Sequence, residues 1–217
     1  GQGIGTISTS GAEGKSINGC PIVVAMPADA KLWSPDSPFL YDVQVTLKSG
    51  GKQVDKVKSY VAMRKVSTKR DANGIVRMQL NNADLFNFGP LDQGWWPDGL
   101  YTAPSYEALI YDLDKTKEWG FNMIRKHVKV EPELWYTYCD KIGILVWQDM
   151  PSGDRNPRWQ MHQYFDGEEM VRSEESEANY RKEWQEIVEQ FSTHPCINVW
   201  VPFNEGWGQF DSVRITK

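Results

Sequence analysis

An alternation of short apolar runs with amphipathic segments is the feature that most constrains this fold. The apolar runs are rich in β-branched and aromatic residues, as in buried strands, and the segments between them carry apolar residues at helical spacing. Strands and helices in strict alternation predict a parallel sheet and an α/β protein. The predicted strands are 84–88, 121–128, 144–149 and 197–204, and the predicted helices are 104–119, 132–143 and 171–192.

Proline and glycine mark the predicted helix ends. Pro104 and Pro132 suit first turns, and Gly120 and Gly143 stop the first two helices. The acidic run 168–177 is expected to be the solvated start of the third helix, where acids suit the helix dipole. The apolar faces predicted for the three helices are Tyr106, Leu109, Ile110 and Leu113; Leu134, Trp135, Tyr138 and Ile142; and Tyr180, Trp184, Ile187, Val188 and Phe191.

Two parallel architectures fit this alternation. An open doubly wound sheet usually carries a glycine fingerprint after an early strand, and none follows a predicted strand here. A (β/α)8 barrel has eight strands and roughly 250 residues. If the fold is such a barrel, the four predicted strands make up its first half.

Residues 1–66 follow a different pattern, with short strand-like runs separated by glycine and proline. Two of these runs, 40–47 and 54–66, flank Ser-Gly-Gly at 49–51, which predicts a hairpin. We interpret 1–66 as part of an immunoglobulin-like β-sandwich. The polar segment 67–74 is predicted to be the turn-forming boundary, and 67–217 the barrel domain.

The last predicted strand ends in a carboxylate. Its apolar run leads directly into Asn204 and Glu205, which places both at the edge where α/β folds carry their chemistry. An ionised carboxylate is costly to bury unpaired, so such a residue is paired, exposed in a cleft or held protonated. A protonated carboxyl can act as a general acid. The alternative is that Glu205 caps a following helix.

Two stretches resemble glycoside hydrolase family 2, the group of β-galactosidases, β-glucuronidases and β-mannosidases. The resemblance extends from about Ala30 to the C-terminus, and the Asn-Glu pair after a His-Pro-x-Ile strand is its most specific part. The matching stretches are GFNMIRKHVKVEPELWYTYCDKIGILVWQDMP at 120–151 and HPCINVWVPFNEGWG at 194–208, with weaker support from LWSPDSPFLYDVQVTL at 32–47.

This resemblance implies a TIM barrel and a retaining double-displacement mechanism. It makes Glu205 the acid/base, Asn204 a donor to the sugar 2-hydroxyl, and Arg125 the residue that orients the nucleophilic carboxylate. Asp149 resembles the mannosidase-like ending of the third strand, whereas His127 matches less closely. The nucleophile, a second glutamate late in the barrel, has no counterpart in these residues. Trp207 either floors a sugar subsite or covers the barrel rim.

The implied function is a retaining exo-β-glycosidase, with β-galactosidase preferred and β-mannosidase or β-glucuronidase as alternatives. Without the nucleophile, we expect the 217 residues alone to be inactive. A non-catalytic carbohydrate-binding or interaction module, or an endo-acting glycanase, remains open. Half a barrel leaves strand edges and apolar surface exposed, so we also expect self-association, with homo-oligomers as one outcome.

Composition narrows the partners. A net charge of −5 with scattered Lys and Arg argues against nucleic acid, and no apolar run is long enough to cross a bilayer. Ten tryptophans suit stacking on sugar rings, although most tryptophans simply pack. We predict a carbohydrate substrate, no cofactor and no metal site. Cys139 and Cys196 are expected to be buried thiols. The N-terminal segment shows no secretion signal, which leaves the compartment open between cytoplasm and periplasm.

Overall fold

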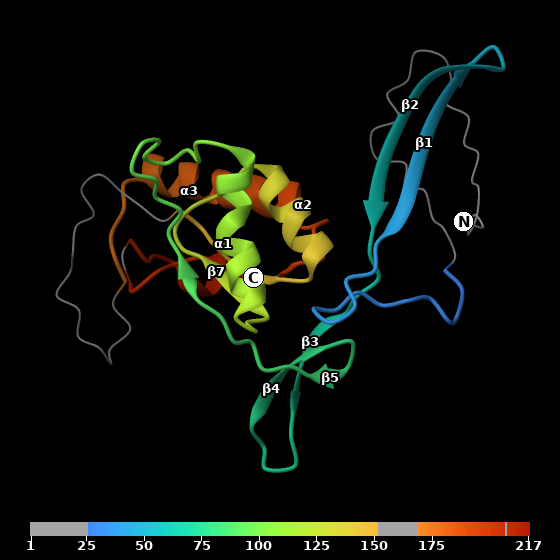
Figure 1. The fold of residues 1–217 in the computed structure, drawn as a ribbon. Helices are drawn as coiled ribbons and strands as arrows, with labels where there is room; N and C mark the ends of the chain where they lie inside the picture. The colour runs from blue at the N-terminus through green and yellow to red at the C-terminus, as the bar shows by residue number, and fades with distance from the viewer. Residues whose placement is uncertain (1–25, 152–168, 207) are drawn as a thin grey trace. The chain divides into compact units, whose positions relative to one another are not determined.

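The structure is a computed structural model that describes residues 26–151, 169–206 and 208–217 (Figure 1). Residues 1–31 and 32–217 form two separate compact units, and the elements below belong to the second. Trp207, a predicted site residue, lies outside the described residues.

A long antiparallel hairpin opens the second unit. Strand β1 (Tyr41–Ser49) pairs with β2 (Lys52–Val61), as the sequence predicts. Gly50 and Gly51 connect them with φ of 55° and 77°, the left-handed conformation that a two-residue type I′ turn requires. Val45 lies opposite Val57, and both side chains are more than half exposed. The apolar face of this hairpin is therefore largely uncovered by the described residues.

A second antiparallel sheet occupies the segment in which the sequence pattern predicts a polar turn. It comprises β3 (Val66–Arg70), β4 (Val76–Leu80) and β5 (Ala83–Asp84). The turn prediction is wrong for 67–70 because these polar side chains stand on an exposed strand paired with β4. It holds at Asp71, whose carboxylate accepts hydrogen bonds from the backbone N–H groups of Asn73 and Ile75. The domain boundary in this segment stays a prediction.

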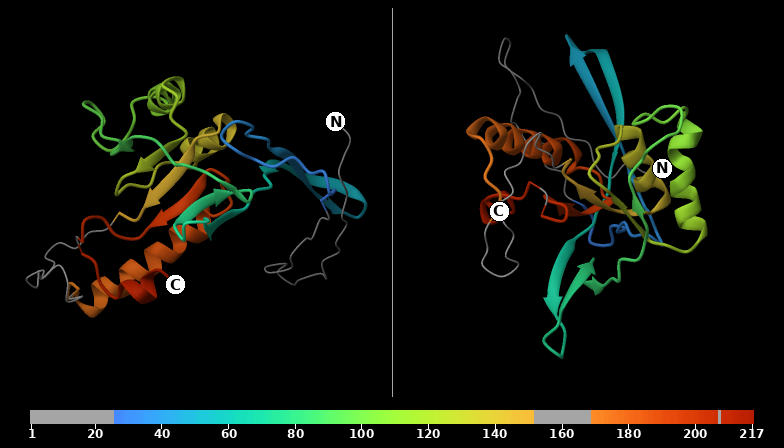
Figure 2. Two further views of the ribbon diagram at one scale, coloured as in Figure 1. Left: turned by 90° about the horizontal axis from the view of Figure 1, so that it is seen from below. Right: turned by 90° about the vertical axis from the view of Figure 1, so that its left-hand side faces the viewer.

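Four parallel strands form the third sheet, in the order β6-β7-β8-β9 (Figure 2). Every neighbouring pair is parallel, as the alternating pattern predicts, and the α/β prediction is confirmed. The strands are β6 (Leu91–Asp92), β7 (Met123–Lys126), β8 (Leu145–Asp149) and β9 (Ile197–Val201).

The first parallel strand differs from the prediction. It lies at 91–92 instead of 84–88, and Ala83 and Asp84 pair with β4 in the antiparallel sheet. Hydrogen bonds to the chain around β7 already begin before residue 91: the N–H of Asn122 donates to the carbonyl of Phe88, and the N–H of Arg125 donates to that of Pro90. A Cβ built on Gly89 would stand 1.6 Å from the carbonyl oxygen of Met123, so the two backbones meet where only glycine fits.

The helices follow their predicted ranges. Ser105 caps α1 by accepting from the N–H of Ala108, and Ser173 caps α3 in the same way. Gly143, with φ of 75°, ends α2 in the left-handed conformation. The helices are α1 (Tyr106–Glu118), α2 (Glu133–Ile142), α3 (Glu174–Phe191) and the short α4 (Ser212–Ile215).

The buried face of α2 is rotated from the predicted one. Leu134 was expected inside but is 59% exposed, whereas Tyr136, Cys139 and Asp140 are fully buried. The side of α2 that carries Asp140 is the buried one, and there the carboxylate accepts hydrogen bonds from the backbone N–H of Cys196 and the hydroxyl of Tyr60. The buried hydrogen bonds of Asp140, rather than the apolar spacing, therefore account for the buried face of α2.

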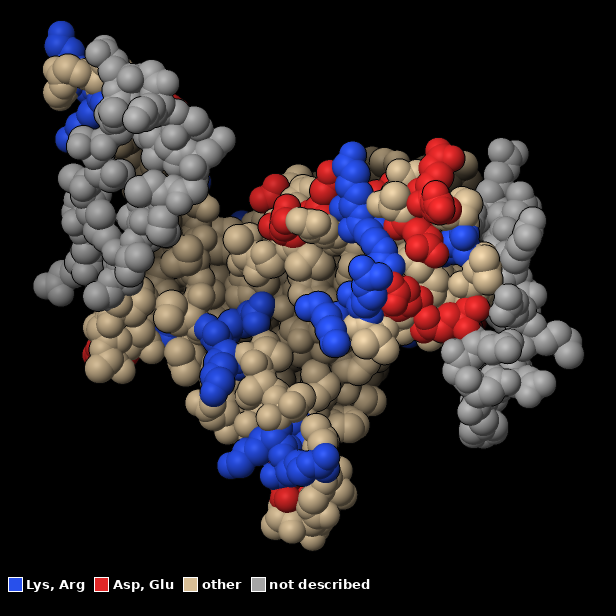
Figure 3. Space-filling model, turned by 180° about the vertical axis from the view of Figure 1, so that it is seen from behind, with Lys and Arg blue, Asp and Glu red and all other residues tan. Residues whose placement is uncertain are grey.

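Acidic and basic side chains lie next to each other on the face shown in Figure 3. The N-terminal turn of α3 carries Glu174, Glu175 and Glu177, which matches the predicted acidic helix start.

Within the described part of the chain, no helix combines the length and apolarity needed to cross a membrane.

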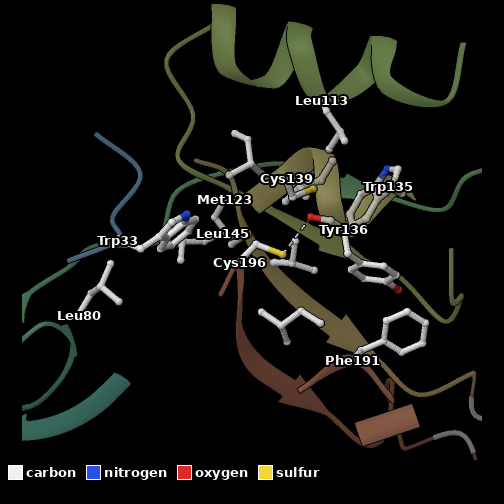
Figure 4. Close-up of a cluster of buried hydrophobic side chains, with 14 residues drawn as sticks. Trp33, Leu80, Leu113, Met123, Trp135, Tyr136, Cys139, Leu145, Phe191 and Cys196 are labelled. Atoms are coloured by element: carbon white, nitrogen blue, oxygen red, sulfur yellow. Dashed lines mark hydrogen bonds between the residues drawn. The ribbon is translucent and has the colours of Figure 1, made fainter. Parts of the chain in front are cut away.

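One hydrophobic core joins the helices to the parallel strands (Figure 4). Leu113 of α1, Trp135 of α2 and Phe191 of α3 all belong to it. Cys139 and Cys196 are buried free thiols, as predicted, and the thiol of Cys196 lies 3.7 Å from the carbonyl oxygen of Tyr136. Burial raises the pKa of both thiols, which keeps them protonated and suited to packing.

Candidate active site

Side chains from three neighbouring strand ends meet at one edge of the parallel sheet. Arg125 of β7 donates from Nε and Nη2 to the two carboxylate oxygens of Asp149 at the end of β8, over 2.9 and 2.8 Å. Its Nη2 also donates to Oδ1 of Asn204, just after β9, over 2.9 Å. The structure thus brings three of the predicted site residues together through direct hydrogen bonds.

Asp149 is the buried centre of this group. Its side chain is 1% exposed, and Oδ2 also accepts from the backbone N–H of Val128 over 3.2 Å. Val128 has φ of 45°, which is a rare and strained conformation for a β-branched residue. The carboxylate therefore holds both the guanidinium and the strained loop that follows β7.

Glu205 stands beside this cluster on an exposed turn. It adopts φ of 53°, and its carboxylate has no hydrogen-bond or ion-pair partner within residues 26–151, 169–206 and 208–217. The helix-capping alternative does not describe it, because α4 begins only at Ser212 and Asp211 occupies its N-cap position. Its side chain is available to a ligand at the sheet edge.

His127 lies on the same rim but outside the hydrogen-bonded cluster. Its Nδ1 is 3.2 Å from Nε2 of Gln93, and its backbone N–H donates to the carbonyl of Asp92. It therefore contacts the loop after β6 and has no direct hydrogen bond to Arg125, Asp149 or Asn204. Trp207 lies outside the described residues.

A layer of buried polar groups supports the site from behind. Gln148 donates to the carbonyls of Lys129 and Asp149 and accepts from the hydroxyl of Tyr136 over 2.6 Å. Burial raises the pKa of Tyr136 well above its usual value, so this hydroxyl remains a donor at any ordinary pH. Each polar group here has a defined partner, which fixes the loop after β7 against β8.

No group of three or more His, Cys, Asp or Glu side chains in the described residues is arranged to hold a metal ion. Three acidic groups of this region already form ion pairs: Asp149 pairs with Arg125, and Asp92 and Glu131 pair with Lys126. The described cluster has the composition of a polar binding site with an available carboxyl group, suited to hydroxyl-rich ligands and proton transfer.

The candidate site therefore belongs to the class found at the strand ends of α/β sheets, and its side chains are Arg, Asp, Asn and Glu. The family model "Glycosyl hydrolases family 2" matches residues 5–64, which extends the resemblance into the N-terminal unit. The resemblance to glycoside hydrolase family 2 is confirmed, and the chain's relatives are O-glycosyl hydrolases of that family.

Three comparisons illustrate the likeness. A beta-mannosidase B of Aspergillus terreus is 30% identical over 193 residues, which cover 81% of this chain and 20% of the relative. A beta-galactosidase of Psychromonas ingrahamii is 28% identical over 183 residues, covering 84% and 16%. The crystal structure of a GH2 beta-galacturonidase from Eisenbergiella tayi bound to galacturonate is 26% identical, with a TM-score of 0.63, covering 83% and 29%. The chain spans about a fifth or less of these two sequence relatives.

Several supporting residues were missed by the sequence analysis. The strained Val128 gives no sequence signal, because valine predicts an extended conformation. Lys126 does leave a signal, because it stands within the predicted buried strand 121–128 and such a charge is found inside only when paired. Lys129 and Glu131 lie between that strand and the next predicted helix, so their burial has no comparable signal.

Proposed function

We propose that this chain is the part of a retaining exo-β-glycosidase that carries the acid/base Glu205. The proposal includes a half TIM barrel built on the four parallel strands and an immunoglobulin-like domain containing the β1–β2 hairpin. The observation that supports it most is the hydrogen-bonded Arg125–Asp149–Asn204 cluster, followed directly by the exposed Glu205, which has no polar partner among the residues that the structure describes. Homologous enzymes with this family's activity provide independent support.

Glu205 donates a proton to the leaving-group oxygen in the first half-reaction. It then removes a proton from the water that attacks the glycosyl-enzyme. This role requires a side chain that reaches a ligand and is not consumed by an internal ion pair. The exposed turn at Glu205 meets this requirement.

Asn204 orients the sugar. Because its Oδ1 accepts from Arg125, the amide Nδ2 is directed away from the guanidinium and presents two N–H donors. A sugar hydroxyl can accept one of them. Asp149 fixes Arg125 in this arrangement, so its role is to position the other two residues.

The attacking carboxylate is assigned to a part of the protein beyond these 217 residues. Retaining glycosidases hold two carboxyl groups roughly 5–5.5 Å apart. Asp149 is unsuited to attack because both of its oxygens are engaged, one by Arg125 and the other by Arg125 and Val128. The short chain alone should therefore lack turnover.

A neutral β-linked sugar is the preferred substrate, and we propose a galactoside. A uronic acid needs an uncompensated cation, but the charge of Arg125 is already balanced by Asp149. His127 contributes a ring that can bond a hydroxyl from the rim. Mannosides remain the nearest alternative, and glucuronides are disfavoured by this charge balance.

An activity screen tests the proposal. The full-length gene product and the 217-residue chain are each assayed with nitrophenyl β-galactoside, β-mannoside and β-glucuronide. We expect the full-length protein to hydrolyse the galactoside fastest with net retention, and the short chain to hydrolyse none. Turnover by the short chain would contradict the assignment of the nucleophile, and inversion would contradict double displacement.

A non-catalytic carbohydrate-binding module is the second candidate. It is favoured by one observation: Asp149, the other carboxylate of the described cluster, has both oxygens engaged by Arg125 and Val128. This function predicts saturable sugar binding by the full-length protein with no hydrolysis of any of the three glycosides. The exposed apolar face of the β1–β2 hairpin further suggests self-association, which light scattering on the isolated chain would detect.

A further inference from the structure

The loop after β6 presents two exposed aromatic side chains at the edge of the sheet that carries the candidate site. Trp95 is 61% exposed and Tyr101 is 45% exposed. Their ring centroids lie 4.7 Å apart at an interplanar angle of 71°, an edge-to-face pair. Because β6 runs parallel to β7 and β8, the loop that follows it lies on the same rim as Arg125 and Asp149.

Buried charges hold this loop in place. Lys126 bonds Asp92, directly before the loop, over 2.6 Å, and Glu131 over 2.8 Å. Lys129 bonds Glu131 and donates to the carbonyl of Gly94 over 2.7 Å. The two lysine side chains are only 1% and 2% exposed. Burying such groups is costly unless their partners are fixed, so the network permits little movement at its point of contact with the loop.

Gly94 fits into this network without spare room. Its φ is 66°, and a Cβ there would stand 2.6 Å from Oε1 of Glu131 and 2.8 Å from Nζ of Lys129. Its backbone N–H is also held, by Oδ1 of Asp92 over 2.8 Å. The backbone direction entering Trp95 is therefore set by buried contacts rather than by solvent.

The aromatic pair connects directly to the candidate site. Lys129 lies over the ring of Tyr101, 4.7 Å from its centroid. The hydroxyl of Tyr101 donates to the carbonyl of Val128 over 3.2 Å, and the N–H of Val128 donates to Asp149. Val128 thus links Tyr101 to Asp149, the carboxylate that positions Arg125 and Asn204.

We propose that Trp95, backed by Tyr101, is an aromatic platform for a second pyranose ring of the substrate. The ring it binds is the neighbour of the terminal sugar oriented by Asn204. The C–H face of a pyranose packs on an indole face, and the backbone leading into Trp95 is already held at Gly94, which lowers the cost of ordering the loop on binding. This inference rests on the proposed function, and it makes the loop after β6 a determinant of leaving-group specificity.

Trp119 is a matched comparison. It is 71% exposed, but it lies at the C-terminal end of α1, which leads into the opposite end of β7, and no buried charge network among the described residues supports it. Exposed single aromatics of this kind are ordinary on protein surfaces. The difference between the two tryptophans therefore isolates the contribution of the rim position.

Trp95→Ala and Trp119→Ala in the full-length protein test the platform. For each we compare kcat/KM for methyl β-galactoside, which has no second ring, with that for lactose, which has one. We expect Trp95→Ala to lower the value for lactose about tenfold, as for loss of roughly 1.4 kcal/mol of binding, with little effect on the methyl glycoside. Trp119→Ala should change neither. An unchanged lactose-to-methyl ratio in Trp95→Ala, or an equal change in Trp119→Ala, would overturn the proposal.

A binding experiment separates this proposal from the proposed hydrolysis. Lactose is titrated calorimetrically into the full-length Glu205→Gln protein, with and without Trp95→Ala. About tenfold weaker binding in the double variant supports the platform even if the parent hydrolyses no glycoside, whereas equal or absent binding overturns it. Trp95→Phe, which keeps an aromatic face, should recover part of the affinity and guards against a folding defect.

Discussion

Arg125 and Asp149 form a two-pronged ion pair across β7 and β8, with nitrogen–oxygen distances of 2.9 and 2.8 Å. The arginine side chain is 26% exposed, whereas the aspartate is almost fully enclosed. Because both prongs are used, the guanidinium plane is fixed, and its Nη2 can reach Asn204 at the same time. This pair therefore joins side chains from the ends of β7, β8 and β9 into one hydrogen-bonded cluster, which Glu205 directly follows in the sequence.

Asp149→Asn should destabilise the protein because it removes the charge that balances Arg125 in a largely buried setting. We expect a loss of about 2 kcal/mol in the free energy of unfolding, below the value for a completely buried pair because Arg125 retains some solvent. Urea denaturation measures it. Glu186→Gln, which breaks an exposed pair with Lys182, should cost less than about 0.5 kcal/mol. Equal losses in the two variants would argue against the central place of Asp149.

Leu113→Ala tests the core that carries the sheet. Leu113 is fully buried, so truncation should lower the free energy of unfolding by about 2–5 kcal/mol. Leu134→Ala on α2 is the control, because that side chain is 59% exposed and should cost less than about 0.5 kcal/mol. A loss in the free energy of unfolding well above this value for Leu134→Ala would show that Leu134 is buried, as the sequence pattern predicts.

Gly94→Ala and Gly120→Ala compare two glycines with positive φ that differ in available space. Gly120 has φ of 83°, and an added methyl group would meet nothing within 4 Å, so alanine there costs only the strained conformation, about 1 kcal/mol. Alanine at Gly94 also collides with Glu131 and Lys129, and should cost about 2–3 kcal/mol. Thermal and urea unfolding distinguish the two, and equal costs would show that the loop yields easily.

Alkaline pH should weaken the contact between Tyr60 and Asp140. Burial, followed by the 2.6 Å hydrogen bond to Asp140, raises the pKa of Tyr60 above its ordinary value of about 10. The folded state therefore keeps a proton that the unfolded chain releases. This stabilisation is complete below about pH 10 and declines as pH rises toward the folded pKa.

Tyr60→Phe removes that contribution. At pH 8 the variant should be about 1.5–2 kcal/mol less stable than the parent, as for a hydrogen bond to a charged group. The gap should narrow in urea titrations between pH 9 and 11, because only the parent loses the Tyr60 contribution there. A gap that stays constant across this range would contradict the pKa assignment.

Sequence reasoning located the elements whose signals are local. Gly143 marks a helix end through its backbone freedom, and the apolar runs identify β7, β8 and β9. The strand-end positions of Arg125 and Asn204 follow from the same pattern, because parallel neighbours end at one edge. Their direct contact could therefore be anticipated in part.

The misplaced features depend on contacts between distant residues. Asp140 rotates the buried face of α2 through its bonds to Tyr60 and Cys196, which lie far from it in the sequence. Gly89 lies too close to the carbonyl of Met123 for any side chain, and this contact is not visible in the local sequence. Val128 likewise combines φ of 45° with a hydrogen bond from its N–H to Asp149, a distant residue, so no local pattern predicts its conformation.

The most direct test of the account is the leaving-group dependence of Glu205→Gln in the full-length protein. Steady-state kcat/KM is measured with nitrophenyl and methyl β-galactosides, whose leaving groups need little and much protonation respectively. Loss of a general acid predicts slowing of the methyl glycoside by about 10²–10⁴-fold, with far less effect on the activated nitrophenyl substrate. Equal slowing of both substrates would contradict proton donation by Glu205.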